Sequence, residues 1–334
     1  MSKVHAVITG VGGYVPKYVL NNAEISTLVD TSDEWITKRI GVKERRILKP
    51  DEGKGITYLA EKALENLKIK KDFDPLEIEA VVFATSTPDY ILPNAASLIA
   101  YRAGMTKAFG FDLGAACSGF VYALEVGQAF IASGKYKKVM VFSGDTLSVV
   151  TDYQDRNTCP IFADGCGVVL LEATTDEEIG ILDGILHSDG NSLESLHMWG
   201  GGSVNPADHE TVNQRMHFIR QDGKVVFKRA VTEMSDACET IMKRNNLSKD
   251  DVKWVVPHQA NMRIIDAVAD RLDVPMEKVM VNIEKYGNSS AGTIPLCLWE
   301  WEHKLHKGDK IILTAFGAGF TWGATYLKWG YDPT

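Results

Sequence analysis

The sequence lacks a paired-cysteine pattern. Its five cysteines are odd in number and scattered, with no Cys-x-x-Cys pair: Cys117, Cys159, Cys166, Cys238 and Cys297. This pattern argues against a disulfide framework and against a structural zinc site. His303 and His306 lie near each other, but they stand among Trp, Glu and Lys residues, where solvated histidines are commoner than ligands. We therefore predict no metal site.

Long apolar runs and an excess of positive charge are also missing. No run approaches the ~20 apolar residues that a membrane-spanning helix needs. The short apolar start from Val4 to Thr9 is followed by no signal-peptide cleavage pattern, so the expected location is the cytoplasm. A formal net charge of −8 argues against nucleic acid as the main partner, although it leaves room for a local basic patch that binds an acidic ligand.

A dinucleotide-binding fingerprint is incomplete. Gly10-Val-Gly-Gly13 follows an expected strand over residues 4–9, but the motif G-x-G-x-x-G requires glycine where Val15 stands, and Pro16 opposes helix entry. We predict a turn at these glycines and no nicotinamide cofactor.

What the sequence does contain is an alternation of buried-strand and helix patterns. Apolar runs predict strands over residues 80–85, 138–145, 165–172 and 254–256, and helix formers predict helices over 57–67 and 228–245. Thr31-Ser-Asp-Glu34 has capping-box spacing and predicts a short helix that carries Trp35 and Arg39. Residues 187–223 read as a long loop or insertion. The acidic stretch 174–178 is the expected boundary between an N-terminal half, 1–174, and a C-terminal half, 175–334.

The two halves resemble each other. Val81-Val-Phe-Ala aligns with Trp254-Val-Val-Pro, Lys138-Val-Met-Val with Lys310-Ile-Ile-Leu, and the Cys117 segment with Asn288-Ser-Ser, at offsets of 173, 172 and 171 residues. A near-constant offset indicates a duplicated α/β unit, which we expect to form mostly parallel sheets covered by helices. Corresponding strand ends then converge about a pseudo-twofold axis, where Cys117 would face His258 and Asn288.

Cys117 lies where a glycine- and alanine-rich turn enters an expected helix. A helix N-terminus favours a thiolate, which would make this cysteine a nucleophile, whereas many free cysteines are simply small buried apolar residues. A cysteine beside a histidine can accept an acyl group from a thioester. His258 and Asn288 could both donate hydrogen bonds to an enolate, or could form a protease-like triad, or could be a core histidine and a turn residue.

Four motifs in order resemble the β-ketoacyl-acyl-carrier-protein synthase III family nearly end to end. They are Asp112-Leu-Gly-Ala-Ala-Cys117-Ser-Gly-Phe, Val256-Pro-His258-Gln-Ala-Asn-Met-Arg, Tyr286-Gly-Asn288-Ser-Ser-Ala-Gly and Phe316-Gly-Ala-Gly-Phe-Thr-Trp-Gly. The resemblance implies a thiolase-like five-layered αβαβα sandwich built from two duplicated halves. It also implies the initiating condensation of type II fatty acid synthesis.

In that resemblance Cys117 takes an acyl group from acyl-CoA, and His258 and Asn288 promote decarboxylation of malonyl-acyl carrier protein. The backbone N–H groups of Cys117 and Ala318 would form the oxyanion hole, with alanine where the family usually has glycine. Further implied contacts are with coenzyme A at Trp35, Arg39 and Arg156, with the carrier protein at Lys228, Gln259 and Arg263, and with the acyl group at Leu92, Leu147 and Phe162.

The family is homodimeric, and Leu92 would reach into the partner's acyl pocket, where a residue smaller than phenylalanine predicts tolerance of branched or longer primers. Asp270-Arg271 departs from the family's adjacent basic residues, so only part of the docking patch is expected. The resemblance implies no cofactor beyond the coenzyme A thioester substrate. Rival readings are a specialised condensing enzyme that makes, for instance, a polyketide or quinolone starter, and a non-catalytic partner of carrier proteins.

Overall fold

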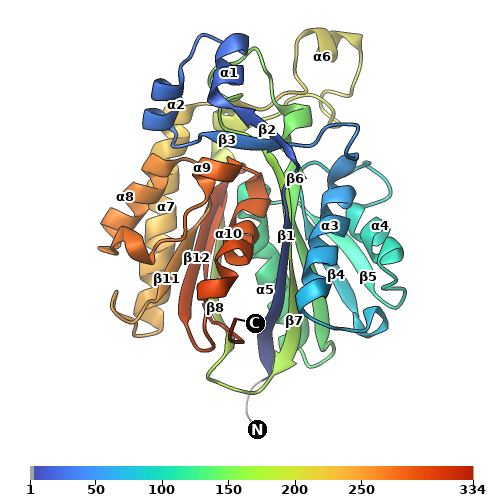
Figure 1. The fold of residues 1–334 in the computed structure, drawn as a ribbon, viewed down its shortest axis with the longest axis vertical. Coiled ribbons are helices and arrows are strands. Elements are labelled where there is room, and N and C mark those ends of the chain that lie inside the picture. The colour runs from blue at the N-terminus through green and yellow to red at the C-terminus, as the bar shows by residue number, and fades with distance from the viewer. Residues whose placement is uncertain (1–3, 334) are drawn as a thin grey trace.

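Residues 4–333 are described by the computed structural model, and their strands form two main sheets (Figure 1). The sheet of the first half has the order β1 (His5–Tyr14), β7 (Asp164–Thr174), β6 (Lys138–Thr146), β4 (Ala80–Ala84) and β5 (Phe109–Leu113). The sheet of the second half has the order β8 (Gly180–Ser188), β13 (Thr321–Lys328), β12 (Lys310–Gly317) and β11 (Trp254–Pro257). The two orders match strand for strand, and a parallel bridge from Val255 to Val279 stands where β5 has its counterpart. The duplicated fold predicted from the offsets is therefore confirmed.

Helices lie in three layers around these sheets. α3 (Gly55–Lys70) and α4 (Ala95–Arg102) cover one outer face, and α7 (Gly223–Arg244) and α8 (Met262–Arg271) cover the other. α5 (Gly119–Ala132) and α10 (Thr293–Trp301) lie between the sheets. The alternation of strand side chains explains the layering, because Val81 and Phe83 face α3 and α4 while Val82 faces α5. The result is a five-layered αβαβα sandwich.

The sheets are mixed, so the expectation of mostly parallel strands was wrong. Three of the seven strand pairings in the two main sheets are parallel, namely β4 with β5, β4 with β6 and β11 with β12. The antiparallel pairing of β12 with β13 follows from a short connection, because only residues 318–320 join the two strands and such a hairpin requires antiparallel strands.

The predicted turn at Gly10–Gly13 was also wrong, because β1 continues through these residues to Tyr14. The glycines serve helix packing instead. A Cβ at Gly12 would lie 2.3 Å from the Ala63 carbonyl oxygen on α3, and a Cβ at Gly13 would lie 2.5 Å from the Trp299 ring on α10. Two missing side chains therefore let helices approach both faces of β1.

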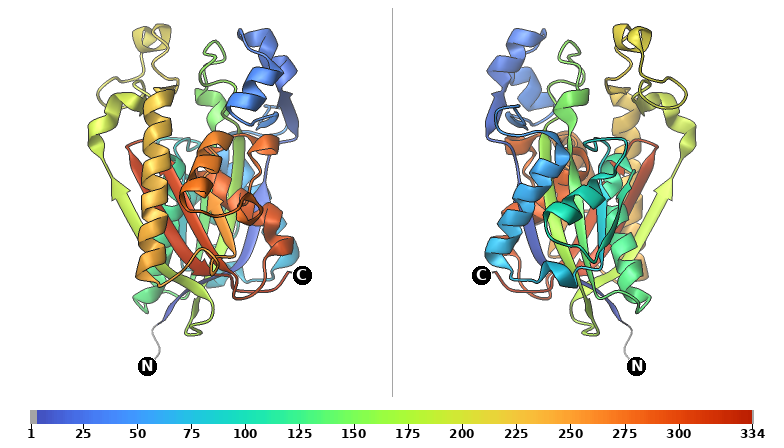
Figure 2. Two further views of the ribbon diagram at one scale, coloured as in Figure 1. Left: turned by 90° about the vertical axis from the view of Figure 1, so that its left-hand side faces the viewer. Right: turned by 90° about the vertical axis from the view of Figure 1, so that its right-hand side faces the viewer.

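Two small segments project beyond one end of the sheets, opposite the termini (Figure 2). One holds β2 (Tyr18–Asn21), α1 (Asn22–Leu28), α2 (Asp33–Arg39) and β3 (Glu44–Ile47); the other holds the short helix Gly190–Ser195, β9 (Leu196–His197), α6 (His209–Asn213) and β10 (Arg220–Gln221). The cap of α2 is Ser32, one residue after the predicted Thr31, and α7 begins at Gly223, five residues before the predicted start. Within residues 4–333, no helix is long and apolar enough to cross a membrane.

Candidate active site

Two short turns, one from each half, meet between the sheets. The turn Ala116–Ser118 precedes α5 and the turn Ser290–Gly292 precedes α10, and the first residue of each has a positive φ, +44° and +54° respectively. The structural counterpart of Cys117 is therefore Ala291. The offset in the sequence had instead aligned Cys117 with Asn288, three residues earlier.

The small residues around these turns allow the two halves to approach. A Cβ at Gly119, the first residue of α5, would lie 2.9 Å from the Ala84 Cβ and 3.1 Å from the Ala291 Cβ. A Cβ at Gly317 would lie 2.7 Å from the Cys117 backbone nitrogen. The end of β12 thus passes directly against the Cys117 turn, and the residue that follows Gly317 is the predicted oxyanion-hole residue Ala318.

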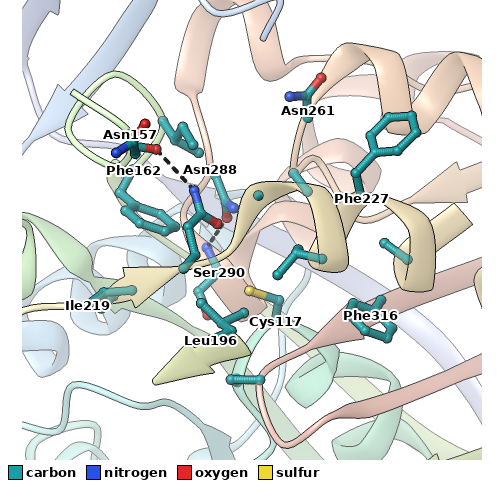
Figure 3. A pocket seen from close by; sticks show the side chains of 18 of the residues that line it. Cys117, Asn157, Phe162, Leu196, Ile219, Phe227, Asn261, Asn288, Ser290 and Phe316 are labelled. Carbon is teal, nitrogen blue, oxygen red and sulfur yellow. Dashed lines mark hydrogen bonds between the residues drawn. The ribbon is translucent and has the colours of Figure 1, made fainter. Parts of the chain in front are cut away.

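Cys117 is partly exposed, and its sulfur faces the pocket beside Ser290 (Figure 3). Burial raises the pKa of its thiol to about 12, while a hydrogen bond with the Ser290 side chain acts in the opposite direction with a smaller effect. The structure therefore differs from the predicted thiolate: without substrate, desolvation outweighs the helix N-terminus and Cys117 carries its proton. Acyl transfer must remove that proton as the sulfur attacks.

His258 follows β11 and is 1 % exposed. Its backbone N–H donates to the Thr314 carbonyl over 2.8 Å, and its ring Nδ1 lies 2.6 Å from the Thr293 hydroxyl oxygen. Burial lowers the pKa of the imidazole to about 3, so the ring is neutral at physiological pH. A neutral imidazole has one N–H, which makes the position of its hydrogen decisive for the chemistry.

Asn288 is oriented by its own turn. Its side-chain Oδ1 accepts a hydrogen bond from the Ser290 backbone N–H over 2.7 Å, which leaves its amide N–H groups as the available donors. Its backbone exchanges hydrogen bonds with Ile161 and Ala163, so the Phe162 segment is held against it. The predicted amide donor is thus fixed in orientation before any substrate binds.

A cavity of about 1150 Å³ joins these groups. Of the predicted site residues, its wall includes Trp35, Arg39, Cys117, Leu147, Phe162, His258, Arg263, Asn288 and Ala318. The wall formed by residues 4–333 does not include Leu92, Arg156, Lys228 or Gln259. The cavity is large and mostly lined by apolar side chains, as expected for a site that binds a long thioester substrate.

An arginine lies over the indole of Trp35, which is part of the cavity wall. The guanidinium carbon of Arg156 lies 5.0 Å from the centre of the Trp35 ring, and its nitrogen is 3.8 Å from the Asp30 carboxylate. Arg39, on the same helix as Trp35, is exposed and lines the cavity. These groups present a flat aromatic face and two cationic side chains at one entrance, which suits a nucleotide with phosphates.

The prediction for Gln259 was wrong. Its side chain is fully buried, donates to the carbonyls of Pro257 and Met280, and accepts from the backbone N–H groups of Asn282 and Ile283. A side chain with all its hydrogen bonds satisfied inside the protein cannot contact a docking partner. Its hydrogen bonds fix the position of the segment that carries His258.

The other predicted contacts lie at the surface. Lys228 and Arg263 are exposed, and Arg263 stacks over the Phe227 ring at 5.2 Å. Arg271 is engaged by Asp236 and by Glu239, so it adds little to a basic patch. Leu92 is 85 % exposed and lies on a loop outside the cavity of its own chain.

Sequence reasoning missed part of the wall. The segment read as a loop returns to the cavity with several side chains, Leu196, His197, Met198, Ile219, Arg220 and Gln221. Apolar residues inside an otherwise polar stretch were the available signal. Ion pairs from Arg215 and Arg220 to the buried Asp152 hold this segment in place.

Asp145 was missed as well. It is fully buried at the end of β6, and its Oδ1 accepts from the Thr85 hydroxyl at 2.9 Å, from the Ser86 N–H at 2.6 Å and from both the N–H and the hydroxyl of Thr87 at 2.9 Å. These bonds fix the segment after β4, from which Ser86 and Thr87 line the cavity. Across residues 4–333, no group of three or more His, Cys, Asp or Glu side chains is arranged to hold a metal ion.

Comparison with known proteins gives one consistent result. Residues 111–190 match the family model described as 3-oxoacyl-[acyl-carrier-protein (ACP)] synthase III, and residues 242–329 match the model of its C-terminal part. The chain is 69 % identical over 332 residues to the beta-ketoacyl-[acyl-carrier-protein] synthase III of Azobacteroides pseudotrichonymphae genomovar. CFP2, covering 99 % of both chains. It is 55 % identical to the protein of that name from Porphyromonas gingivalis (strain ATCC 33277), covering 99 % of this chain and 98 % of the relative.

Solved structures agree. The 3-oxoacyl-[acyl-carrier-protein] synthase III of Aquifex aeolicus VF5 superposes with a TM-score of 0.88 at 40 % identity, over 97 % of this chain and 100 % of the other. The priming beta-ketosynthase of the R1128 polyketide pathway superposes with a TM-score of 0.91 at 32 % identity, over 100 % and 98 %.

Proposed function

Because the chain belongs to the β-ketoacyl-acyl-carrier-protein synthase III family and shares its thiolase-like fold, it is an acyltransferase that performs the initiating condensation of fatty acid synthesis; we propose that Cys117, His258 and Asn288 carry out the chemistry. The observation that carries this proposal is the cavity itself. It brings one thiol from the first half together with a neutral imidazole and an oriented amide from the second.

In the first step the Cys117 sulfur attacks the thioester carbonyl of an acyl-CoA. The carbon–sulfur bond to coenzyme A breaks, the coenzyme A thiol leaves with a proton, and an acyl-cysteine remains. The developing oxyanion would be held by the backbone N–H groups of Cys117 and Ala318. The close approach at Gly317 supports this pairing, because it places the two backbones against each other.

In the second step malonyl-acyl carrier protein loses CO2. The carbon–carbon bond to the carboxylate breaks, and its electron pair becomes an enolate whose oxygen accepts hydrogen bonds from the Asn288 amide and the His258 N–H. The enolate carbon attacks the carbonyl carbon of the acyl group on Cys117 and forms the new carbon–carbon bond. The bond from that carbonyl carbon to the Cys117 sulfur breaks, 3-oxoacyl-acyl carrier protein is released, and the Cys117 thiolate takes up a proton from solvent. Neutral donors suit this step, because they stabilise the enolate without protonating it fully.

Coenzyme A is assigned to the mouth of the cavity. Trp35 would stack on the adenine, and Arg39 and Arg156 would pair with phosphates. We expect Trp35→Ala and Arg156→Ala each to raise KM for acyl-CoA several-fold with little change in kcat. Lys38→Ala, an exposed position on the same helix, serves as the matched control. Equal effects from all three variants would contradict the assignment.

The acidic carrier protein is assigned to the surface that carries Lys228 and Arg263, next to the cavity. Positive charge at the rim of an interface chiefly accelerates association and makes it sensitive to salt. This patch is positive on a chain whose overall net charge is −8, as docking of an acidic partner requires.

We also propose a homodimer, formed through the edge of the first sheet. Within residues 4–333, no strand pairs with the outer edge of β5, and large apolar side chains are exposed near it, including Tyr101 at 79 %, Ile91 at 86 % and Leu92 at 85 %. In such a dimer Leu92 would reach the partner's acyl pocket, opposite Leu147 and Phe162. We place this enzyme in the cytoplasm with its coenzyme A substrates.

One experiment tests the sequence of steps. The protein is incubated with labelled acyl-CoA, and malonyl-acyl carrier protein is then added. Label on Cys117 is expected, and its absence would contradict the nucleophile assignment. His258→Ala and Asn288→Ala should still become acylated but condense poorly. If either variant condenses at the wild-type rate, the assignment of the enolate donors is wrong.

The likeness to a priming ketosynthase of a polyketide pathway favours one second candidate, a specialised starter enzyme with the same three residues. Primer preference tests the acyl pocket proposed for either candidate. We expect isobutyryl-CoA to be accepted at a kcat/KM comparable with that of acetyl-CoA, and a strong preference for acetyl-CoA would contradict the proposed pocket.

A further inference from the structure

Thr293 is a buried hydroxyl that none of the steps above uses. It is the first residue of α10, is 2 % exposed and lies behind His258. Its Oγ1 is 2.6 Å from His258 Nδ1, 3.1 Å from the Ser290 carbonyl oxygen and 3.3 Å from the Gln259 backbone nitrogen. A hydroxyl has one hydrogen, so these three contacts cannot all be donations.

The partners of the hydroxyl decide where its hydrogen goes. The Gln259 N–H can only donate, so Oγ1 accepts there. The Ser290 carbonyl already accepts the Thr293 backbone N–H, and its contact with the hydroxyl is the longer of the two remaining ones. His258 Nδ1 has the shortest contact, and among residues 4–333 this is the hydrogen bond found for the ring.

We infer that Thr293 is a positioning residue whose hydroxyl donates to His258 Nδ1 and thereby keeps the imidazole hydrogen on Nε2, the ring nitrogen that this contact leaves available to a substrate in the cavity. In a histidine, the hydrogen bond made by one ring nitrogen sets the protonation of the other. This inference rests on the proposed role of His258 as a donor to the enolate. With the opposite tautomer, Nε2 would present a lone pair and would repel the enolate oxygen.

The same turn therefore orients both donors. The Ser290 backbone N–H holds the Asn288 oxygen, and the Thr293 hydroxyl three residues later holds His258. The amide and the imidazole, both in the cavity wall, each keep an N–H that none of these contacts occupies, so no reorganisation is needed when negative charge develops. A rigid 3₁₀ turn entering a helix fixes the spacing between the two contacts.

The tautomer can be read directly on the substrate-free protein. With ¹⁵N-labelled histidine, the His258 resonances are assigned by their loss in His258→Gln. The expected result is a protonated Nε2 and an unprotonated, hydrogen-bonded Nδ1 at pH 7. A protonated Nδ1 overturns the inference, and because no substrate is involved, this outcome is separate from any failure of the proposed function.

Kinetics supply the second readout. Thr293→Val keeps the branched shape but removes the hydroxyl, and we expect acylation of Cys117 to stay within about twofold while decarboxylation of malonyl-acyl carrier protein falls by about tenfold or more, on the scale of losing an oriented donor. Thr293→Ser should restore the rate. Wild-type decarboxylation in Thr293→Val overturns the inference.

Thr325→Val is the matched control, since it also removes a buried threonine hydroxyl from the second half but lies on β13 outside the cavity wall. It should leave both steps unchanged. If Thr325→Val slows decarboxylation as much as Thr293→Val, the effect is general loss of packing and the inference fails.

Discussion

The burial of His258 predicts how the stability of the protein depends on pH. The pKa of the imidazole is lowered by burial from an ordinary value of 6.5 to about 3. The unfolded chain therefore binds a proton at this site that the folded chain rejects. The contribution to the free energy of unfolding is fully present above pH 6.5 and is lost as pH falls toward 3.

The magnitude follows from the pKa shift. Between pH 6.5 and pH 4.5 the loss amounts to two pH units at about 1.4 kcal/mol each, or about 3 kcal/mol. Other groups also titrate in this range, so the quantity to measure is a difference between two proteins. His258→Asn removes the titrating group and leaves the others in place.

The assay is urea denaturation of the wild type and of His258→Asn at pH 7 and pH 4.5. We expect the wild type to lose about 3 kcal/mol more than the variant does between the two conditions. The imidazole should also show no titration between pH 5 and pH 8 in NMR spectra. Equal losses in the two proteins would refute a neutral, desolvated His258, and with it the role of this ring as an uncharged donor.

Three further predictions concern other parts of the molecule. Gly119→Ala should lower the free energy of unfolding by about 1–3 kcal/mol, because its Cβ would press on the opposite turn. Gly114→Ala is the control, since a Cβ there meets no atom within 4 Å, and it should leave the free energy of unfolding unchanged. Equal denaturation midpoints for the two variants would contradict this packing. Arg263→Ala should raise KM for malonyl-acyl carrier protein at low salt but not KM for acyl-CoA, whereas Lys243→Ala at the far end of α7 should change neither. Leu92→Phe should reduce kcat/KM for isobutyryl-CoA by about tenfold relative to acetyl-CoA, a scale typical of small changes in pocket volume; an unchanged ratio would remove Leu92 from the acyl pocket.

Local sequence patterns predicted much of the fold because they act over a few residues. The apolar run that forms β4 is buried on both sides, and a period of two residues decides which side chains face each layer. The duplication was visible in the spacing of motifs, and the strand orders confirm it. Gly12 and Gly13 show the limit of such reasoning. A side chain at these positions would collide with Ala63 and Trp299, which are distant in sequence.

For the candidate site, the sequence by itself determined which residues are able to act and roughly where each stands, Cys117 at a helix entry and His258 after a strand. Only the tertiary structure decided their states. Desolvation keeps the Cys117 proton in place and the His258 ring neutral, and it depends on every layer packed around them. The structure also turned Gln259 inward, because three of the four backbone groups it satisfies come from residues 280–283, more than twenty positions along the chain.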